Sequence, residues 1–183
     1  VINMPPRGSI GVFNRSYYED VLVVRVHNLQ KDYAMPTRCI GMPPSEFFDM
    51  RYREIRDFER YLWESGYRLV KIFLNESKRE QAKRFVARID DERKNWKFSK
   101  SDMRERELWD EYMTAYEDAI GATATKRAPW HVIPADQKWF ARYLISEAIV
   151  GTLEDVDPHY PEMPADQKAR LASCRDMLCS RDR

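Results

Sequence analysis

The sequence has few cysteines and no long apolar run. Its three cysteines, Cys39, Cys174 and Cys179, have neither the number nor the spacing of a disulfide framework or a zinc site. This scarcity suits a reducing compartment, so we expect a cytoplasmic protein. No apolar stretch approaches the ~20 residues that a membrane-spanning helix needs, and the first residues do not resemble a secretion signal. The sequence therefore argues against a disulfide-rich secreted protein and predicts no membrane partner.

The chain also lacks an excess of charge of either sign. Its 31 Lys and Arg residues oppose 30 Asp and Glu residues, for a formal net charge of +1. No overall field therefore recruits nucleic acid or an anionic membrane, and any anion site must come from local clustering. With 183 residues, of which 43% are hydrophobic, the chain is long enough for one core, and we expect one domain.

Short apolar runs alternate with longer stretches of helical periodicity. Residues 10–13, 69–74 and 130–133 have the composition of buried strands, while periodicity leaves residues 18–26 open between helix and strand. Helices are expected at residues 45–66, 77–89, 101–120 and 136–153, with N-caps at Ser45, at Ser77 and at Ser101 or Asp102, followed by a weakly helical tail. This alternation predicts a layered α/β domain with a mostly parallel sheet.

The first candidate site follows the first predicted strand. Its polar residues lie within one short turn: Asn14, Arg15, Ser16, Tyr18, Glu19 and Asp20. Phosphoryl transfer requires cations on the equatorial oxygens and acidic groups that hold a metal or the nucleotide, and a guanidinium binds two phosphate oxygens at once. The alternative is that Arg15 forms a surface ion pair with Glu19 or Asp20 that closes the turn.

The second candidate is a cationic stretch interrupted by Trp96. Its basic residues are Lys78, Arg79, Lys83, Arg84, Arg88, Arg93, Lys94, Lys97, Lys100, Arg104 and Arg106. On a helix, Arg84 and Arg88 lie one turn apart on the same face, so their guanidinium groups could follow a linear polyanion. The alternative is a solvated helix face that nearby carboxylates balance.

The third candidate lies where the last predicted strand gives way to a helix. It contains Asp136, Lys138 and Arg142. Polar groups at the carboxyl ends of strands in an open α/β sheet lie at its functional edge. Alternatively, Asp136 is only the N-cap of the helix that follows. His131, His27 and His159 form no evident metal set.

Long motifs in these regions resemble the polyphosphate kinase 2 family, in order and spacing, from about residue 6 to residue 161. They are GSIGVFNRSYYEDVLVVRVH at residues 8–27, RYREIRDFERYL at 51–62, SKREQAKRFVARID at 77–90, NWKFSKSD at 95–102 and APWHVIPADQKWFAR at 128–142. The resemblance implies a P-loop-kinase-like, thymidylate-kinase-like three-layer fold. It implies a partial polyphosphate kinase 2 domain at residues 1–161, a Walker-B-like strand at 10–15, a helical lid at 77–102 and a tail at 162–183.

The resemblance also implies roles for individual residues. Arg15 and Glu19 are expected to be catalytic. The expected phosphate and nucleotide contacts are Asn14, Ser16, Tyr18, Asp20, Lys78, Arg84, Arg88, Lys97, Asp136, Lys138 and Arg142. The implied reaction transfers phosphoryl groups from inorganic polyphosphate to AMP, ADP or both, with Mg²⁺. Assembly as a homodimer or homotetramer is a further expectation.

Two features depart from the family pattern. No G-x-x-x-x-G-K phosphate loop occurs, and the chain starts at Val1 close to a strand-like run, so we interpret it as a fragment that is inactive by itself and whose main metal ligand lies before it. The second departure is Glu76, an acidic residue before the lid where family members usually have an apolar one; it is expected to weaken polyanion binding.

Two other functions remain open at this point. The basic lid would also suit a non-catalytic module that binds polyphosphate or RNA, although few aromatic residues are left to stack on bases. An ordinary ATP-dependent nucleotide kinase is the other alternative.

Overall fold

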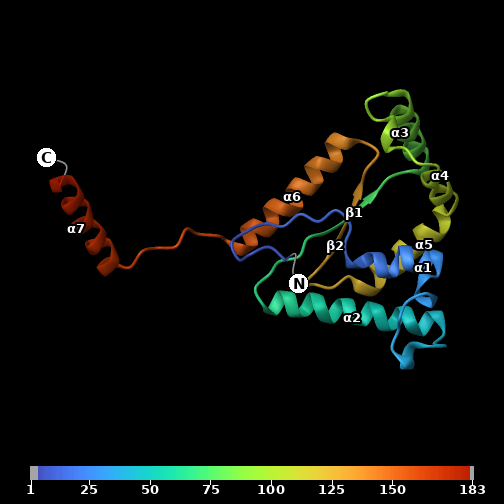
Figure 1. The fold of residues 1–183 in the computed structure, drawn as a ribbon, viewed down its shortest axis with the longest axis horizontal. Coiled ribbons are helices and arrows are strands. Elements are labelled where there is room, and N and C mark those ends of the chain that lie inside the picture. The colour runs from blue at the N-terminus through green and yellow to red at the C-terminus, as the bar shows by residue number, and fades with distance from the viewer. Residues whose placement is uncertain (1–3, 182–183) are drawn as a thin grey trace. The chain divides into compact units, whose positions relative to one another are not determined.

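The computed structural model describes residues 4–181 (Figure 1). Contacts divide the chain into two units, Val1–Ile149 and Val150–Arg183. In the described part, no helix is both long and apolar enough to cross a membrane. The first unit carries both strands and all the candidate site residues.

The sheet consists of β1 (Lys71–Asn75) and β2 (Trp130–Pro134), which pair in parallel. Lys71 lies opposite Trp130, and Asn75 opposite Pro134. Parallel neighbours require a crossover, here formed by α3 (Lys78–Asp90), η4 (Asn95–Lys97), α4 (Lys100–Glu107) and α5 (Trp109–Thr123). The parallel pairing and two of the three predicted strands are confirmed.

The predicted strand at residues 10–13 is wrong. These residues have no regular secondary structure, and the side chains of Ile10, Val12 and Phe13 are 70%, 90% and 55% exposed. A β-branched run becomes a strand only where a neighbouring ladder pairs with it and a packed face buries it. Within residues 4–181, nothing supplies either.

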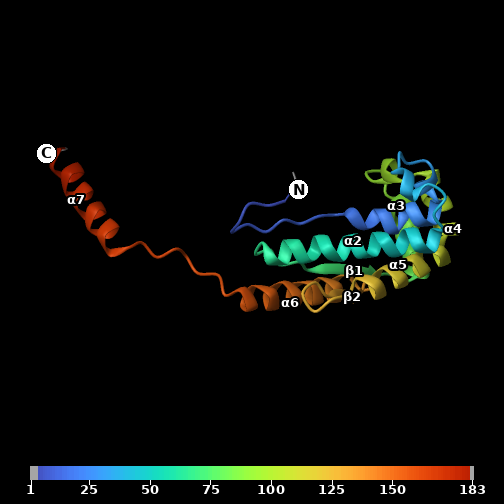
Figure 2. The same cartoon turned by 90° about the horizontal axis from the view of Figure 1, so that it is seen from below.

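The core of the first unit lies between α2 (Pro44–Glu64), η1 (Tyr17–Val21), α1 (Val23–His27) and α5. Apolar residues of α2 at helical spacing, including Phe48, Tyr52 and Ile55, pack against Ala115 and Ala119 of α5. The strands lie between α2 and the first part of α6 (Lys138–Val156), as expected for a layered domain (Figure 2). The short turns η2 (Leu29–Lys31) and η3 (Thr37–Cys39) lie between α1 and α2.

Several helix ends differ from the predictions. Pro44 is the first residue of α2, so Ser45 is not its N-cap; the fixed φ of proline suits a helix start. The long helix expected at residues 101–120 is two helices, α4 and α5, separated at Leu108. Ser99, rather than Ser101 or Asp102, caps α4, and Asp102 completes its capping box. In the second unit, α7 (Ala165–Arg181) forms the predicted helical tail.

Candidate functional site

The turn at Arg15 connects an extended segment to η1. Ser16 is the N-cap of η1, and its Oγ accepts a hydrogen bond from the Tyr18 backbone N at 3.3 Å. Arg15 has a φ of 72°, in the left-handed region, which costs a residue with a side chain about 1–2 kcal/mol. Backbone strain of this kind is often found at functional sites.

The Arg15 side chain is exposed and makes no ion pair with any residue between 4 and 181. The surface ion pair with Glu19 or Asp20 is therefore not the arrangement that the structure shows. Arg15 and Glu19 both lie close enough to Tyr116 of α5 to influence its pKa. Burial and the negative charge of Glu19 raise this pKa, and the positive charge of Arg15 lowers it. The Arg15 guanidinium is therefore available to an external anion.

A buried polar network lies directly behind this turn. Lys71 Nζ lies 2.8 Å from Glu59 Oε2, and these side chains are only 6% and 2% exposed. The hydroxyl groups of Tyr18 and Tyr17 donate to Glu59 Oε1 at 2.8 Å and 3.0 Å. Lys71 Nζ also donates to the Tyr18 hydroxyl and to the Thr123 carbonyl, both at 3.0 Å. The network thus joins η1, α2, β1 and α5.

The network corrects the expectation for Tyr18. Its side chain is in the core, not at an exposed edge, and burial raises its pKa. Burial also lowers the pKa of Lys71, against the opposing effect of Glu59. Sequence reasoning missed Glu59 and Lys71, although a lysine inside an apolar strand and a glutamate on the apolar face of α2 are unusual enough to indicate a buried pair.

The segment predicted to form a lid begins where the two strands end. The backbone N of Ser77 donates to Asp136 Oδ1 at 2.7 Å, and Ser77 Oγ accepts from the Glu80 backbone N at 3.1 Å. Ser77 is therefore the N-cap of α3, as predicted. Asp136 binds this neighbouring turn, and the hydrogen bonds from Ser77 lower its pKa. This carboxylate oxygen thus accepts from the turn before α3, and α6 begins at Lys138, two residues after Asp136.

Arg84 is held at this junction by protein partners. Its Nη1 lies 2.7 Å from Glu76, and its Nε lies 3.2 Å from Glu80. Its Nη2 donates to the carbonyl groups of Ala135 at 2.7 Å and Asp136 at 3.2 Å. Arg84 thus connects α3 to the end of β2.

The other predicted lid cations are more exposed. Arg88 lies over the Phe85 ring at 5.6 Å and 4.0 Å from Asp102. Lys97 lies over the Trp96 ring at 5.1 Å. Both cations are bound weakly enough to exchange these partners for phosphate oxygens.

The remaining predicted residues lie at or near the surface. Lys78 is 6.0 Å from the Trp109 ring, and its carbonyl accepts a hydrogen bond from Arg106 at 2.7 Å. Asn14, Asp20, Lys138 and Arg142 have exposed side chains.

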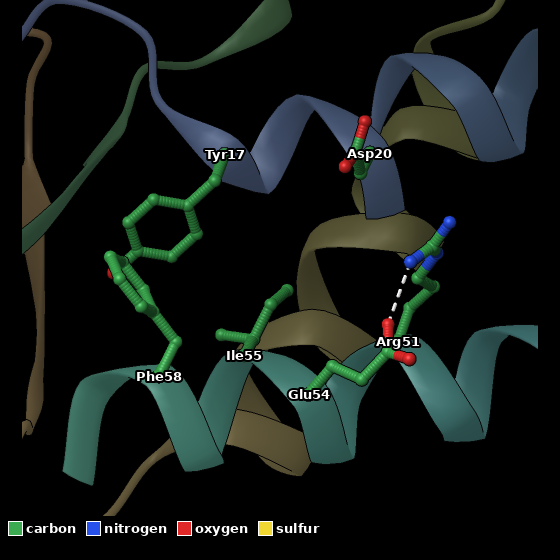
Figure 3. A pocket seen from close by; sticks show the side chains of 6 residues that line it. All are labelled: Tyr17, Asp20, Arg51, Glu54, Ile55 and Phe58. Carbon is green, nitrogen blue, oxygen red and sulfur yellow. Dashed lines mark hydrogen bonds and ion pairs between the residues drawn. The ribbon is translucent and has the colours of Figure 1, made fainter. Parts of the chain in front are cut away.

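A cavity of about 170 Å³ opens beside the first candidate turn. Figure 3 shows that η1 and α2 line it with Tyr17, Asp20, Arg51, Glu54, Ile55 and Phe58. A second cavity, of about 270 Å³, is lined by Arg25, Val26, Glu111 and Thr114. Neither cavity is lined by Arg15, Arg84 or Arg88.

The sequence is also similar to known proteins. The profile described as Polyphosphate kinase 2 matches residues 1–161. The chain is 46% identical over 178 residues to an ADP-polyphosphate phosphotransferase of Rhodopseudomonas palustris, covering 96% of this chain and 61% of that protein. It is 45% identical over 159 residues to an AMP/ADP-polyphosphate phosphotransferase of Meiothermus ruber, covering 87% of this chain and 55% of that protein. The chain thus spans less than two thirds of both relatives.

A solved structure agrees with these matches. The crystal structure of polyphosphate kinase 2 from Arthrobacter aurescens superposes with a TM-score of 0.78 at 40% identity, covering 93% of this chain and 56% of that one. Sequence and fold therefore lead to the same conclusion: the chain belongs to the polyphosphate kinase 2 family.

Proposed function

We propose that the protein transfers phosphoryl groups between inorganic polyphosphate and adenine nucleotides, with AMP, ADP or both as acceptor. The observation that carries this proposal is Arg15, an exposed guanidinium on a strained turn, without a carboxylate partner in the described part of the chain. The names of the two relatives, which specify ADP and AMP/ADP, support the substrate class.

The candidate residues have different proposed roles according to their position in the fold. Arg15 stabilises charge on the transferred phosphoryl group, and Glu19 orients the reacting groups beside it. Lys78, Arg84, Arg88 and Lys97 bind the polyphosphate chain along the lid. Nucleotide and phosphate contacts at the edge come from Asn14, Ser16, Asp20, Asp136, Lys138 and Arg142. Tyr18, which is buried, supports the turn from behind.

Mg²⁺ is the cation that we propose for this reaction. No cluster of three or more metal-ligating His, Cys, Asp or Glu side chains occurs among the residues that the structure describes. The residues present therefore do not form a complete protein site. Mg²⁺ commonly takes many of its ligands from water and substrate phosphates, with only one or two carboxylates from the protein.

The deciding experiment incubates the full-length protein with AMP, long-chain polyphosphate and Mg²⁺, and follows ADP by chromatography. ADP formation that depends on polyphosphate supports the proposal. An enzyme that forms ADP with ATP as the donor, and none with polyphosphate, is an ordinary nucleotide kinase.

The density of cations along the lid supports a second candidate function, a non-catalytic polyphosphate-binding module. Retention of labelled polyphosphate on a filter over a salt series, together with no turnover of AMP or ADP, would favour this module. Absence of retention even at low salt would reject it. We keep RNA only as a competitor in this assay and propose no nucleic-acid partner.

Replacing Arg88 with alanine is expected to raise the KM for polyphosphate by about tenfold with little change in kcat. The reason is that one charge-assisted contact to the donor is lost outside the reacting centre. Steady-state kinetics at fixed AMP measure the effect. Arg93→Ala is the matched control, because Arg93 is also a lid cation but is 87% exposed and paired with Asp91. Equal effects of the two substitutions would mean that overall charge, and not position, determines donor binding.

A cytoplasmic location, no membrane partner and assembly into a dimer or tetramer remain proposals. Light scattering of the purified full-length protein measures its oligomeric state directly.

A further inference from the structure

Glu76 lies immediately after β1, at the root of the lid. Its Oε1 is 2.7 Å from Arg84 Nη1, and the two side chains are 23% and 28% exposed. Oε1 is shielded from solvent and has no partner in hydrogen-bond geometry. The contact with Arg84 is therefore held by charge and proximity rather than by a directed hydrogen bond.

Other charges also face Glu76. Glu80 and Arg84 are on α3, while Asp136 and Lys138 follow β2. Burial raises the pKa of Glu76 above its ordinary value of 4.5; Arg84 and Lys138 oppose this shift, and Glu80 and Asp136 add to it. The surroundings thus disfavour the ionised form of the Glu76 carboxylate, and the positive charge of Arg84 offsets part of this cost.

Arg84 has two kinds of partner. The carbonyl groups of Ala135 and Asp136 fix the position of its Nη2. Glu76 and Glu80 occupy the other nitrogens with negative charge. Glu80 is one helical turn from Arg84 on α3 and moves with it, whereas Glu76 lies outside the helix. An incoming phosphate can therefore displace Glu76 while Arg84 stays anchored to the end of β2.

We propose that Glu76 sets the affinity for polyphosphate by competing with it for Arg84. This inference rests on the proposed function, because it takes polyphosphate as the ligand of the lid. The carboxylate occupies Arg84 in the free protein, and a phosphate group replaces it when the donor binds. Glu76 is thus an affinity-determining residue and not a catalytic one.

Replacing Glu76 with glutamine tests the competition. We expect the full-length Glu76→Gln variant to bind long-chain polyphosphate about two- to fivefold more tightly, since a part-exposed ion pair no longer has to be broken. The measurement is filter retention at low salt without nucleotide. Glu92→Gln is the matched control: it removes the same charge from an exposed side chain elsewhere in the lid, so it reports the effect of net charge alone.

A double substitution separates competition from other causes. In an Arg84→Gln background, Glu76→Gln is expected to give no tighter binding, because the guanidinium that both anions share is gone. Equal tightening in both backgrounds, or none beyond Glu92→Gln, would overturn the inference and leave the proposed function standing. If no variant retains polyphosphate at low salt, the proposed function fails too.

The pH dependence of binding gives a test that does not need the Arg84 variant. Protonation removes the competing charge, so polyphosphate binding to the unsubstituted protein should strengthen as pH falls through the raised pKa of Glu76. The Glu76→Gln variant should lack this step, while any contribution from Glu80 or Asp136 should persist in it. The same step in both proteins would contradict the role of Glu76.

Discussion

Replacing Lys71 with methionine is expected to lower the free energy of unfolding by about 3–5 kcal/mol, the range for removing one partner of a buried ion pair. Methionine fills similar space but leaves the Glu59 carboxylate, only 2% exposed, without its counter-charge. It also removes the donor to the Thr123 carbonyl. Urea denaturation of the full-length protein, followed by circular dichroism, measures the loss.

A second substitution identifies the cause of this loss. Adding Glu59→Gln to Lys71→Met removes the stranded charge and keeps a side-chain oxygen that accepts from Tyr17 and Tyr18. We expect the double variant to recover at least half of the lost stability. A double variant less stable than Lys71→Met would show that packing, rather than the uncompensated charge, dominates.

Replacing Arg15 with alanine is expected to lower kcat by about 10³-fold, the lower end of the range for an arginine that stabilises phosphoryl transfer. The KM for polyphosphate should change little, because the lost contact acts on charge that develops in the transition state. Steady-state kinetics of the full-length protein, with polyphosphate and AMP varied in turn, separate the two parameters.

Two variants control for charge and geometry at this site. Arg15→Lys keeps the charge but loses the planar fork, so its kcat should fall between those of the unsubstituted protein and Arg15→Ala. Arg127→Ala removes an arginine that is 54% exposed and lies 3.8 Å from Glu64, and it should leave kcat unchanged. Unchanged kcat in Arg15→Ala would mean that Arg15 is an ordinary surface residue.

Periodicity predicted the elements whose partners lie within the described chain. The strands at residues 69–74 and 130–133 were found because each supplies the other with a parallel ladder. The run at residues 10–13 has similar composition but no such neighbour, and its apolar side chains remain exposed. Sequence pattern reports what a segment can bury, whereas its secondary structure also depends on what is available to cover it.

The candidate site was also predictable only in part. Parallel strands end at one edge, so strand order predicts that Asp136 lies at the polar edge of the sheet. Its hydrogen-bond partner could not be predicted in this way, because the backbone N of Ser77, which follows the neighbouring strand, binds its carboxylate. The Lys71–Glu59 pair joins residues 12 positions apart through tertiary packing, and only the folded backbone shows that their side chains meet.

The parallel strand pair is held at both ends by contacts beyond the two strands. Lys71, in the first pair, is anchored within the core. In the last pair, Asn75 and Pro134 are exposed, but the Ala135 backbone N donates to the Asn75 carbonyl at 3.0 Å, and Arg84 donates to the Ala135 carbonyl. Both ends of the sheet thus depend on residues outside it, so a substitution at either end changes the surroundings of other elements as well as its own strand.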